Sequence, residues 1–153
     1  MHITILAPGK TKEMYIQQGV DDFLTRLNRY TKATLIEVKV KGRAAKSGDK
    51  DLEADSLLGR VPAGSYLVSL DPRGSSLSSE QLASNIRKLE NQGTGVMTFV
   101  IGGPQGISEK VLNQSSLVLS LSKMTFTHDM ARLLLVEQLY RAYSINAGSG
   151  YHK

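Results

Sequence analysis

The stretch Val96-Met97-Thr98-Phe99-Val100-Ile101-Gly102-Gly103-Pro104-Gln105-Gly106 decides the fold class. Apart from Thr98, its first six residues are apolar, as expected for a strand that is buried on both faces in a parallel sheet. The glycines follow at once, at the carboxyl end of the strand, where α/β sheets bind ligands. Adjacent glycines let a ligand approach the backbone closely. The stretch therefore predicts an α/β domain with a ligand site beside Gly102 and Gly103, and a tight turn without a ligand is the alternative.

Short β-rich runs alternate with helical stretches on both sides of this segment, as in α/β domains. Ser78 and Gln81 have the spacing of a capping box, and Ser108 is expected to cap a short helix. Asp129 is expected to satisfy donors at the start of the last helix, with a His128-Asp129 dyad as the alternative. We expect the other strands at 2–7, 34–40, 66–70 and 117–121, helices at 14–29, 51–58, 79–92, 108–114 and 129–145, a basic loop at 41–50 and a turn at 71–74.

Length and composition indicate one folded domain, 1–153. The chain has 153 residues, 41% of them apolar and 22% charged, whereas disordered chains are poorer in apolar groups. It has no cysteine, which excludes disulfides, thiolate nucleophiles and metal sites built on cysteine. No apolar run approaches the roughly 18 residues of a membrane span, and the first residues lack the pattern of a secretory signal. We therefore expect a cytoplasmic protein.

Common catalytic motifs are missing from the sequence. The glycine loop is neither G-x-G-x-x-G nor a P-loop, and no G-x-S-x-G elbow occurs. The three histidines, His2, His128 and His152, are too scattered to suggest a metal site, so none is expected. His152 belongs to a tail, Tyr151-His152-Lys153, that follows a glycine-rich hinge at 148–150. Such a tail either frays or closes over a site.

The positive charge is concentrated at one end of the sequence. The formal net charge is +5. Residues 1–50 hold ten Lys/Arg and five Asp/Glu, whereas residues 51–153 hold nine of each. Lys41, Arg43, Lys46 and Lys50 form the densest basic segment, which fits contacts with the phosphates of a nucleic acid. An ordinary solvated loop is the alternative.

The last expected helix, 129–145, has apolar side chains nearly all round. A helix that covers one face of a sheet needs an apolar stripe only about 100° wide. The surplus apolar surface therefore predicts a homodimer built on this helix. The alternative is a helix sandwiched within one chain.

Three segments together resemble one known family. They are Leu70-Asp71-Pro72-Arg73-Gly74, then Phe99-Val100-Ile101-Gly102-Gly103-Pro104-Gln105-Gly106, and the stretch from Leu119 to Lys153 with Leu121-Ser122-Lys123-Met124-Thr125-Phe126-Thr127-His128 and Glu137-Gln138-Leu139-Tyr140-Arg141-Ala142. In order and spacing they resemble the RlmH (YbeA-like) family of ribosomal RNA large-subunit methyltransferases, part of the SPOUT superfamily. The resemblance spans essentially the whole chain, including its Tyr-His-Lys ending.

The resemblance implies a fold, a partner and a reaction. The fold is a SPOUT-type α/β-knot: a mainly parallel sheet with helices on both faces and a deep C-terminal trefoil knot, formed within about 66–153. The implied enzyme is a homodimer that uses S-adenosyl-L-methionine to methylate N3 of a pseudouridine in helix 69 of 23S rRNA, on assembled ribosomes. Two alternatives are a SPOUT methyltransferase for another rRNA or tRNA site, and a non-catalytic ribosome-associated RNA-binding factor.

The resemblance also assigns residue roles. His152 is the candidate base or proton relay, Tyr151 orients or stacks on the target base, and Arg141 and Arg132 hold phosphate or uracil oxygens. Lys41, Arg43 and Lys46 become the RNA-docking surface. Two departures are Gly150, where the family usually has proline, and Ser75, where lysine is common. The implied cofactor-binding residues are Leu70, Gly102, Gly103, Leu121, Ser122, Lys123, Met124, Thr125 and Phe126.

Overall fold

The computed structural model describes residues 1–47 and 49–153. Within them the chain forms one five-stranded sheet in the order β2-β1-β4-β3-β5, and every neighbouring pair is parallel. This confirms the expected α/β class with a parallel sheet. The strands are β1 (His2–Pro8), β2 (Ala33–Val38), β3 (Tyr66–Ser76), β4 (Val96–Val100) and β5 (Leu117–Ser120).

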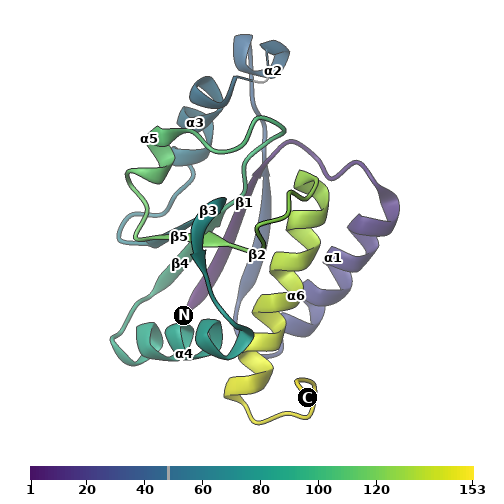
Figure 1. Cartoon of the computed structure of the whole chain (residues 1–153), viewed down its shortest axis with the longest axis vertical. Helices are drawn as coiled ribbons and strands as arrows, with labels where there is room; N and C mark the ends of the chain where they lie inside the picture. Colours follow the sequence, from purple (N-terminus) through teal and green to yellow (C-terminus); the bar gives the residue numbers. More distant parts are fainter. Residues whose placement is uncertain (48) are drawn as a thin grey trace.

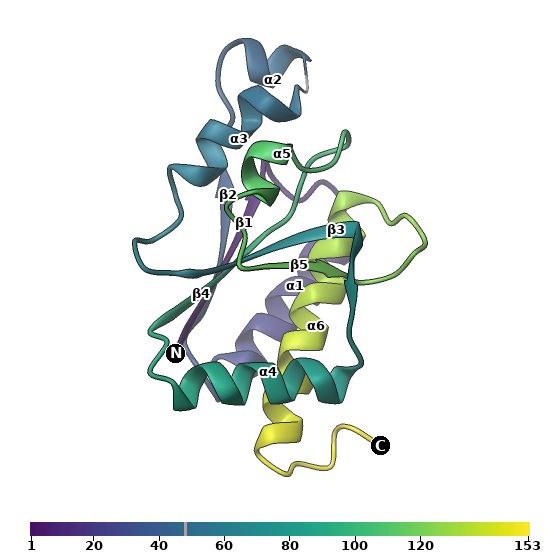
Figure 2. The same ribbon diagram turned by 60° about the vertical axis from the view of Figure 1, so that its left-hand side comes forward.

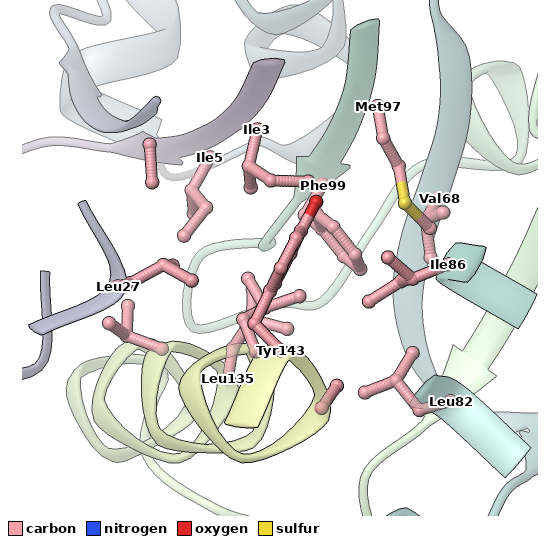
Figure 3. Packing of buried hydrophobic residues seen from close by; sticks show 14 of the residues in the cluster. Ile3, Ile5, Leu27, Val68, Leu82, Ile86, Met97, Phe99, Leu135 and Tyr143 are labelled. Carbon is pink, nitrogen blue, oxygen red and sulfur yellow. The ribbon is translucent and has the colours of Figure 1, made fainter. Parts of the chain in front are cut away.

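Helices cover both faces of the sheet, as the resemblance implies (Figure 1). On β1, Ile3 and Ile5 belong to the cluster shared with three of the helices, whereas Leu6 belongs to the cluster on the other face, because successive side chains of a strand point to opposite sides. One layer contains α1 (Met14–Leu27), α4 (Ser79–Asn91) and α6 (His128–Asn146), and the other contains α3 (Lys50–Leu58) and α5 (Glu109–Leu112). Figure 3 shows Ile3, Ile5 and Phe99 pointing toward Leu135 and Tyr143 of α6.

The central strand β4 is the buried strand that the sequence predicts. It lies between β1 and β3, and Phe99 and Val100 are fully buried. Its one polar side chain, Thr98, is also buried and shares a hydrogen bond of 2.6 Å with the Ser65 hydroxyl. The glycine loop follows β4 directly, so a rigid strand fixes where that loop begins.

Two expectations about irregular segments are wrong. Residues 71–74 do not form a turn that closes the third strand: β3 continues to Ser76, and its pairing with β5 shifts register between Leu70 and Ser75. A Cβ at Gly74 would lie 2.5 Å from the Val118 carbonyl oxygen, so the two backbones pass closer there than any side chain allows. The basic loop 41–50 also contains a short helix, α2 (Arg43–Ser47).

The capping predictions are mostly correct. The capping box of Ser78 and Gln81 is present at the start of α4, and the Ser108 hydroxyl accepts from the Lys110 N–H at the start of α5. At the start of α6, however, the cap is Thr127, whose hydroxyl accepts from the Met130 N–H at 3.1 Å. The expectation for Asp129 is therefore wrong.

Helix α6 is covered within its own chain. It packs against both α1 and α4, and each of its residues is buried or half-buried. The apolar side chains on all sides of this helix are thus explained by a sandwiched position, the alternative that the sequence left open. A homodimer stays a prediction, but it no longer follows from an exposed face of α6. The trefoil knot also stays a prediction, although the close backbone passage at Gly74 is what crossing segments require.

None of the helices in the part of the chain described here is both long enough and apolar enough to cross a membrane.

Candidate functional site

A cavity of about 680 Å³ opens at the carboxyl ends of β3, β4 and β5. We call it the glycine-loop pocket. Three segments form its walls: the irregular part of β3, the loop after β4, and the loop between β5 and α6. Its position is the one that the buried strand and its glycines predict. The lining residues are 70–72, 101–107, 121–122, 124–128 and Ala131.

The loop after β4 has little freedom to change shape. The Gly106 N–H donates to the Gly103 carbonyl at 2.9 Å, and Gly106 has a φ of +84°, which favours glycine. A Cβ at Gly102 would lie 2.6 Å from the Gly106 carbonyl carbon and 2.8 Å from Ile107 Cγ1. The loop therefore folds back on Gly102, and only a glycine fits there.

The loop between β5 and α6 contributes apolar side chains to the rim. Met124 is 75% exposed and Phe126 is 38% exposed, although both line the pocket. The loop is held locally: the Ser122 hydroxyl accepts from the Met124 N–H at 3.0 Å, and Thr127 caps α6. Exposed apolar groups around a concave site are typical of surfaces that bind a ligand.

One carboxylate lies at the pocket wall. Asp71 is buried, and the Arg73 side chain donates to it at 3.0 Å from Nε and 3.0 Å from Nη2. These bonds hold the pKa of Asp71 below its usual range, although burial acts in the opposite direction. Asp71 is therefore ionised at neutral pH and already paired within the chain.

The structure brings most of the implied cofactor residues together. Lys123 is the exception, because it is exposed and is not part of the pocket lining. The residues that do line the pocket are Leu70, Gly102, Gly103, Leu121, Ser122, Met124, Thr125 and Phe126.

Arg132 lies in the interior rather than at an RNA-accessible surface. Its side chain is 0% exposed and donates to the carbonyls of Pro8 and Gly9 at 2.9 and 3.0 Å. Its guanidinium also lies 3.8 Å from Glu37 and 4.0 Å from Asp129. This placement does not fit the predicted contact with RNA oxygens, because the guanidinium is buried and joins the end of β1 and the residues after it to α6.

Asp129 connects the starts of two helices. Its Oδ2 accepts from the backbone N–H groups of Lys12 and Glu13 at 2.8 and 3.1 Å, directly before α1 begins. Burial alone would raise the pKa of Asp129, but these two bonds, together with the nearby charge of Arg132, lower it below its usual range. Asp129 thus holds the segment that leads into α1 and does not cap its own helix.

The C-terminal tail is docked on α6 and α4. Tyr151 Oη donates to Glu137 Oε1 at 3.0 Å, and Arg141 Nε donates to the same oxygen at 3.1 Å. His152 Nε2 lies 2.8 Å from Glu80 Oε1, and its Nδ1 lies 3.3 Å from Arg141 Nη1. Burial and Glu137 raise the pKa of Tyr151, which keeps the phenol protonated. Three of the four candidate catalytic residues, Arg141, Tyr151 and His152, therefore form one cluster.

This tail cluster does not reach the pocket of its own chain. The pocket meets the first turn of α6, at His128 and Ala131, whereas the tail follows the other end of that 19-residue helix. The cluster is anchored at Glu137 and Arg141, six and ten residues beyond Ala131 along α6, which is a rise of about 9 to 15 Å. The cofactor residues and the tail cluster are brought together in two separate places.

The basic segment lies at the end of the molecule opposite the tail (Figures 1 and 2). Lys41, Arg43 and Lys46 are all exposed. Their segment leads into α3, which packs against α5 just beyond the glycine loop. The basic segment is therefore connected through α3 to the pocket wall.

Sequence reasoning missed several pocket residues and one residue behind the pocket wall. Asp71 and Pro72 were visible in the Asp-Pro-Arg-Gly motif but were interpreted only as a turn. His128 and Ala131 lie on the first turn of α6, where the helix pattern carries no sign of a pocket. Glu53 of α3, which accepts from the Gly103 N–H at 3.2 Å, had no sequence signal. In residues 1–47 and 49–153, no cluster of three or more His, Asp or Glu side chains has the geometry to hold a metal ion.

Comparisons with known proteins agree with this geometry. A family model described as predicted SPOUT methyltransferase matches residues 1–152. The chain is 50% identical over 149 residues to Ribosomal RNA large subunit methyltransferase H of Desulfotalea psychrophila, covering 97% of both chains. It is 46% identical over 159 residues to the protein of the same name from Halothermothrix orenii, covering 100% of both.

Two solved structures share the fold at low sequence identity. A probable methyltransferase from Bordetella pertussis superposes with a TM-score of 0.55 at 14% identity, covering 93% of this chain and 96% of that one. A Legionella pneumophila putative methyltransferase, solved with bound SAM, gives a TM-score of 0.50 at 13% identity, covering 91% of this chain and 65% of that one. These likenesses support the architecture of the sheet and its helices.

Proposed function

The chain belongs to the SPOUT methyltransferase family, and from this premise we propose that it methylates 23S rRNA with S-adenosyl-L-methionine, at N3 of a pseudouridine in helix 69. The observation that supports this most is the 50% identity, over 97% of both chains, to a Ribosomal RNA large subunit methyltransferase H. The glycine-loop pocket supplies a matching site for the cofactor.

The pocket fits S-adenosyl-L-methionine in size and in chemistry. Its volume of about 680 Å³ lies within the roughly 300–1,000 Å³ of small-molecule sites. Gly102 and Gly103 offer bare backbone, and Leu70, Leu121 and Phe126 offer apolar walls. Such a lining suits a largely neutral adenosine. The cofactor supplies, when bound, a methyl group on a positively charged sulfur.

Catalysis by this chain then requires alignment and a proton acceptor. When bound, the cofactor would supply its methyl group to the substrate N3, and this chain must hold N3 in line with that group and accept the proton that N3 loses. Holding the two reactants in line converts an encounter into a productive geometry. Among side chains, imidazole is suited to take a proton near neutral pH. We assign this role to His152, with Tyr151 stacking on the base and Arg141 holding its oxygens.

The contacts of His152 suggest how its imidazole is prepared. An Nε2–H that donates to Glu80 leaves Nδ1 unprotonated, and Nδ1 then accepts from Arg141. Once Arg141 turns to an RNA oxygen, the Nδ1 lone pair is free to take the proton from N3. Glu80 thereby sets the tautomer that the reaction needs.

The separation of the tail from the pocket supports a homodimer as the working form. Because none of Arg141, Tyr151 and His152 lines the pocket of its own chain, we take a complete site to need the pocket of one copy and the tail of another. A symmetric pair would build two such composite sites. Lys41, Arg43 and Lys46 would hold the RNA backbone beside them. Action on assembled ribosomes and a cytoplasmic location are part of the same proposal.

The direct test is transfer of a labelled methyl group to ribosomes that lack the modification, followed by mass spectrometry of the RNA fragment. We expect one methyl on the helix 69 pseudouridine, with free 23S rRNA and tRNA as comparison acceptors. Transfer to tRNA or to another rRNA position would support a different SPOUT specificity. Failure to bind S-adenosyl-L-methionine in calorimetry would favour a non-catalytic RNA-binding factor.

A further inference from the structure

Glu53 is a buried carboxylate that the proposed mechanism does not use. It lies on the inner face of α3 beside Ala54 and Leu57 and is only 7% exposed. Its hydrogen bond is from the Gly103 backbone N–H to Oε1, at 3.2 Å. Among the residues that the structure describes, no basic side chain offsets its charge.

This placement costs stability. An ionised carboxylate loses its hydration on burial, and one hydrogen bond does not replace it. Burial accordingly raises the pKa of Glu53, and the Gly103 N–H only partly opposes the shift. The fold by itself thus gains little from a charge at this position, whereas Gly103, which Glu53 contacts, lines the pocket.

Glu53 is in direct contact with the glycine loop. A Cβ on Gly103 would lie 3.0 Å from Glu53 Oε2 and 3.2 Å from Oε1, so the carboxylate packs against the backbone. The Gly103 carbonyl in turn accepts from Gly106, which closes the loop. Glu53 itself is not part of the pocket lining, so it acts from behind the loop.

Helix α3 also holds the segment that follows the loop. The Ser108 hydroxyl donates to Asp51 Oδ1 at 2.6 Å, and Lys110 forms an ion pair with Asp55. Three carboxylates on one short helix therefore contact the loop and the start of α5. Of these, only Glu53 reaches a residue that lines the pocket.

We propose that Glu53 is a positioning residue for cofactor binding: its carboxylate fixes Gly103, and thereby the loop 102–106, in the shape that receives the cofactor. The proposal rests on the proposed function, because it takes the pocket ligand to be S-adenosyl-L-methionine. The proposal predicts that Glu53 raises the affinity for the cofactor and lowers the stability of the fold.

Two variants separate positioning from a merely structural role. Glu53→Gln keeps an acceptor oxygen at the same reach and removes the charge. We expect its affinity for S-adenosyl-L-methionine to stay within about threefold of the unchanged chain, and its unfolding temperature to rise. Glu53→Leu removes the acceptor, and we expect its affinity to fall about tenfold while its circular dichroism spectrum stays native. Calorimetric titration and thermal unfolding measure both effects.

Asp55→Asn is the matched control. Asp55 lies on the same helix, is exposed and pairs with exposed Lys110, so its affinity for the cofactor should not change. If Glu53→Leu binds S-adenosyl-L-methionine as tightly as the unchanged chain, the positioning role of Glu53 is wrong, while the proposed function still stands. The positioning role is also wrong if Glu53→Gln loses both cofactor affinity and thermal stability. If the unchanged chain binds no S-adenosyl-L-methionine, the proposed function fails first, and the two failures are distinguishable.

Discussion

Gly102 shows how much of the pocket depends on a single missing side chain. Its position at the end of β4 places it against Gly106 and Ile107, with no room for a methyl group. The neighbouring atoms are mostly backbone, which cannot move aside without opening the loop. Any larger residue must therefore change the wall against which the cofactor is proposed to lie.

Gly102→Ala is expected to weaken S-adenosyl-L-methionine binding at least tenfold. The reason is steric, since the new Cβ would lie 2.6 Å from Gly106 backbone atoms. Gly95→Ala is the control, because a Cβ at Gly95 meets nothing within 4 Å. Calorimetric titration of both variants measures the difference. If Gly102→Ala binds as tightly as Gly95→Ala, the loop is not the cofactor wall.

Arg132→Met is expected to lower the free energy of unfolding by about 3–5 kcal/mol, because it leaves buried charge without its partner. Two backbone carbonyls lose their donor, and the carboxylates of Asp129 and Glu37 lose the nearby positive charge. Arg26→Met is the control: Arg26 is exposed and pairs with Asp22 one turn away, so its loss should cost less than about 1 kcal/mol. Urea denaturation distinguishes the two. A small loss for Arg132→Met would restore a surface role for this arginine.

Asp129 links two elements, the start of α6 and the start of α1, and its effect depends on pH. Because its pKa is lower in the folded chain than the ordinary value of about 3.9, it stabilises the fold above that value. The contribution is lost as pH falls through the lowered pKa. Asp129→Asn keeps the acceptor oxygen but not the charge. We expect its stability to fall less steeply than that of the unchanged chain below about pH 4.

Thermal unfolding across this acid range tests the expectation. Asp22→Asn is the control, since Asp22 is exposed and its carboxylate serves only a surface pair. If Asp129→Asn and the unchanged chain lose stability in parallel on acidification, then Asp129 does not link α1 and α6 electrostatically.

The elements differ in how far the sequence predicts them. The bounds of β4 and the capping box at Ser78 follow from local patterns, namely an apolar run and a side chain three residues from its partner. The continuation of β3 beyond Asp71 does not follow from a local pattern, because it depends on pairing with β5, which is more than 40 residues away in sequence. For the same reason, Pro72 and Gly74 indicate a turn locally and lie within a strand in the folded chain.

At the scale of the whole molecule, Lys41, Arg43 and Lys46 are exposed, and their segment lies at one end of the molecule (Figure 1). Replacing Lys41, Arg43 and Lys46 with glutamine is expected to weaken ribosome binding and to lower the salt slope by about one per lost phosphate contact. Cofactor affinity should not change. The control replaces three exposed cations elsewhere, Arg29, Lys32 and Lys88. An unchanged salt slope for the first triple variant would contradict RNA docking at this segment.

The proposed composite site has a whole-molecule test of its own. His152→Ala damages the tail and Gly102→Ala damages the pocket, so each variant alone should transfer little methyl. Coexpressed, they form mixed dimers in which one site combines an intact pocket with an intact tail. We expect recovery of about a quarter of the normal activity, since half of the dimers are mixed and one of their two sites is complete. No recovery would mean that pocket and tail act within one chain.

The sequence by itself determined the features that depend on neighbours along the chain. The apolar run at 96–101, the glycines after it and the caps at Ser78 and Ser108 all identify their structures locally. The cofactor residues that the resemblance implies stay a prediction, although eight of the nine line one pocket. Local patterns succeed here because a capping hydrogen bond joins residues only two or three positions apart, and a strand buried on both faces is a continuous apolar run.

Only the tertiary structure decided what packs against what. It buried Arg132 against the carbonyls of Pro8 and Gly9, enclosed α6 between α1 and α4, and docked His152 outside the pocket of its own chain. It also brought Glu53 to Gly103, across 50 residues of sequence. The residue type of an arginine or a glutamate does not say whether its side chain is exposed or buried. Its role depends on long-range contacts that no local sequence pattern records.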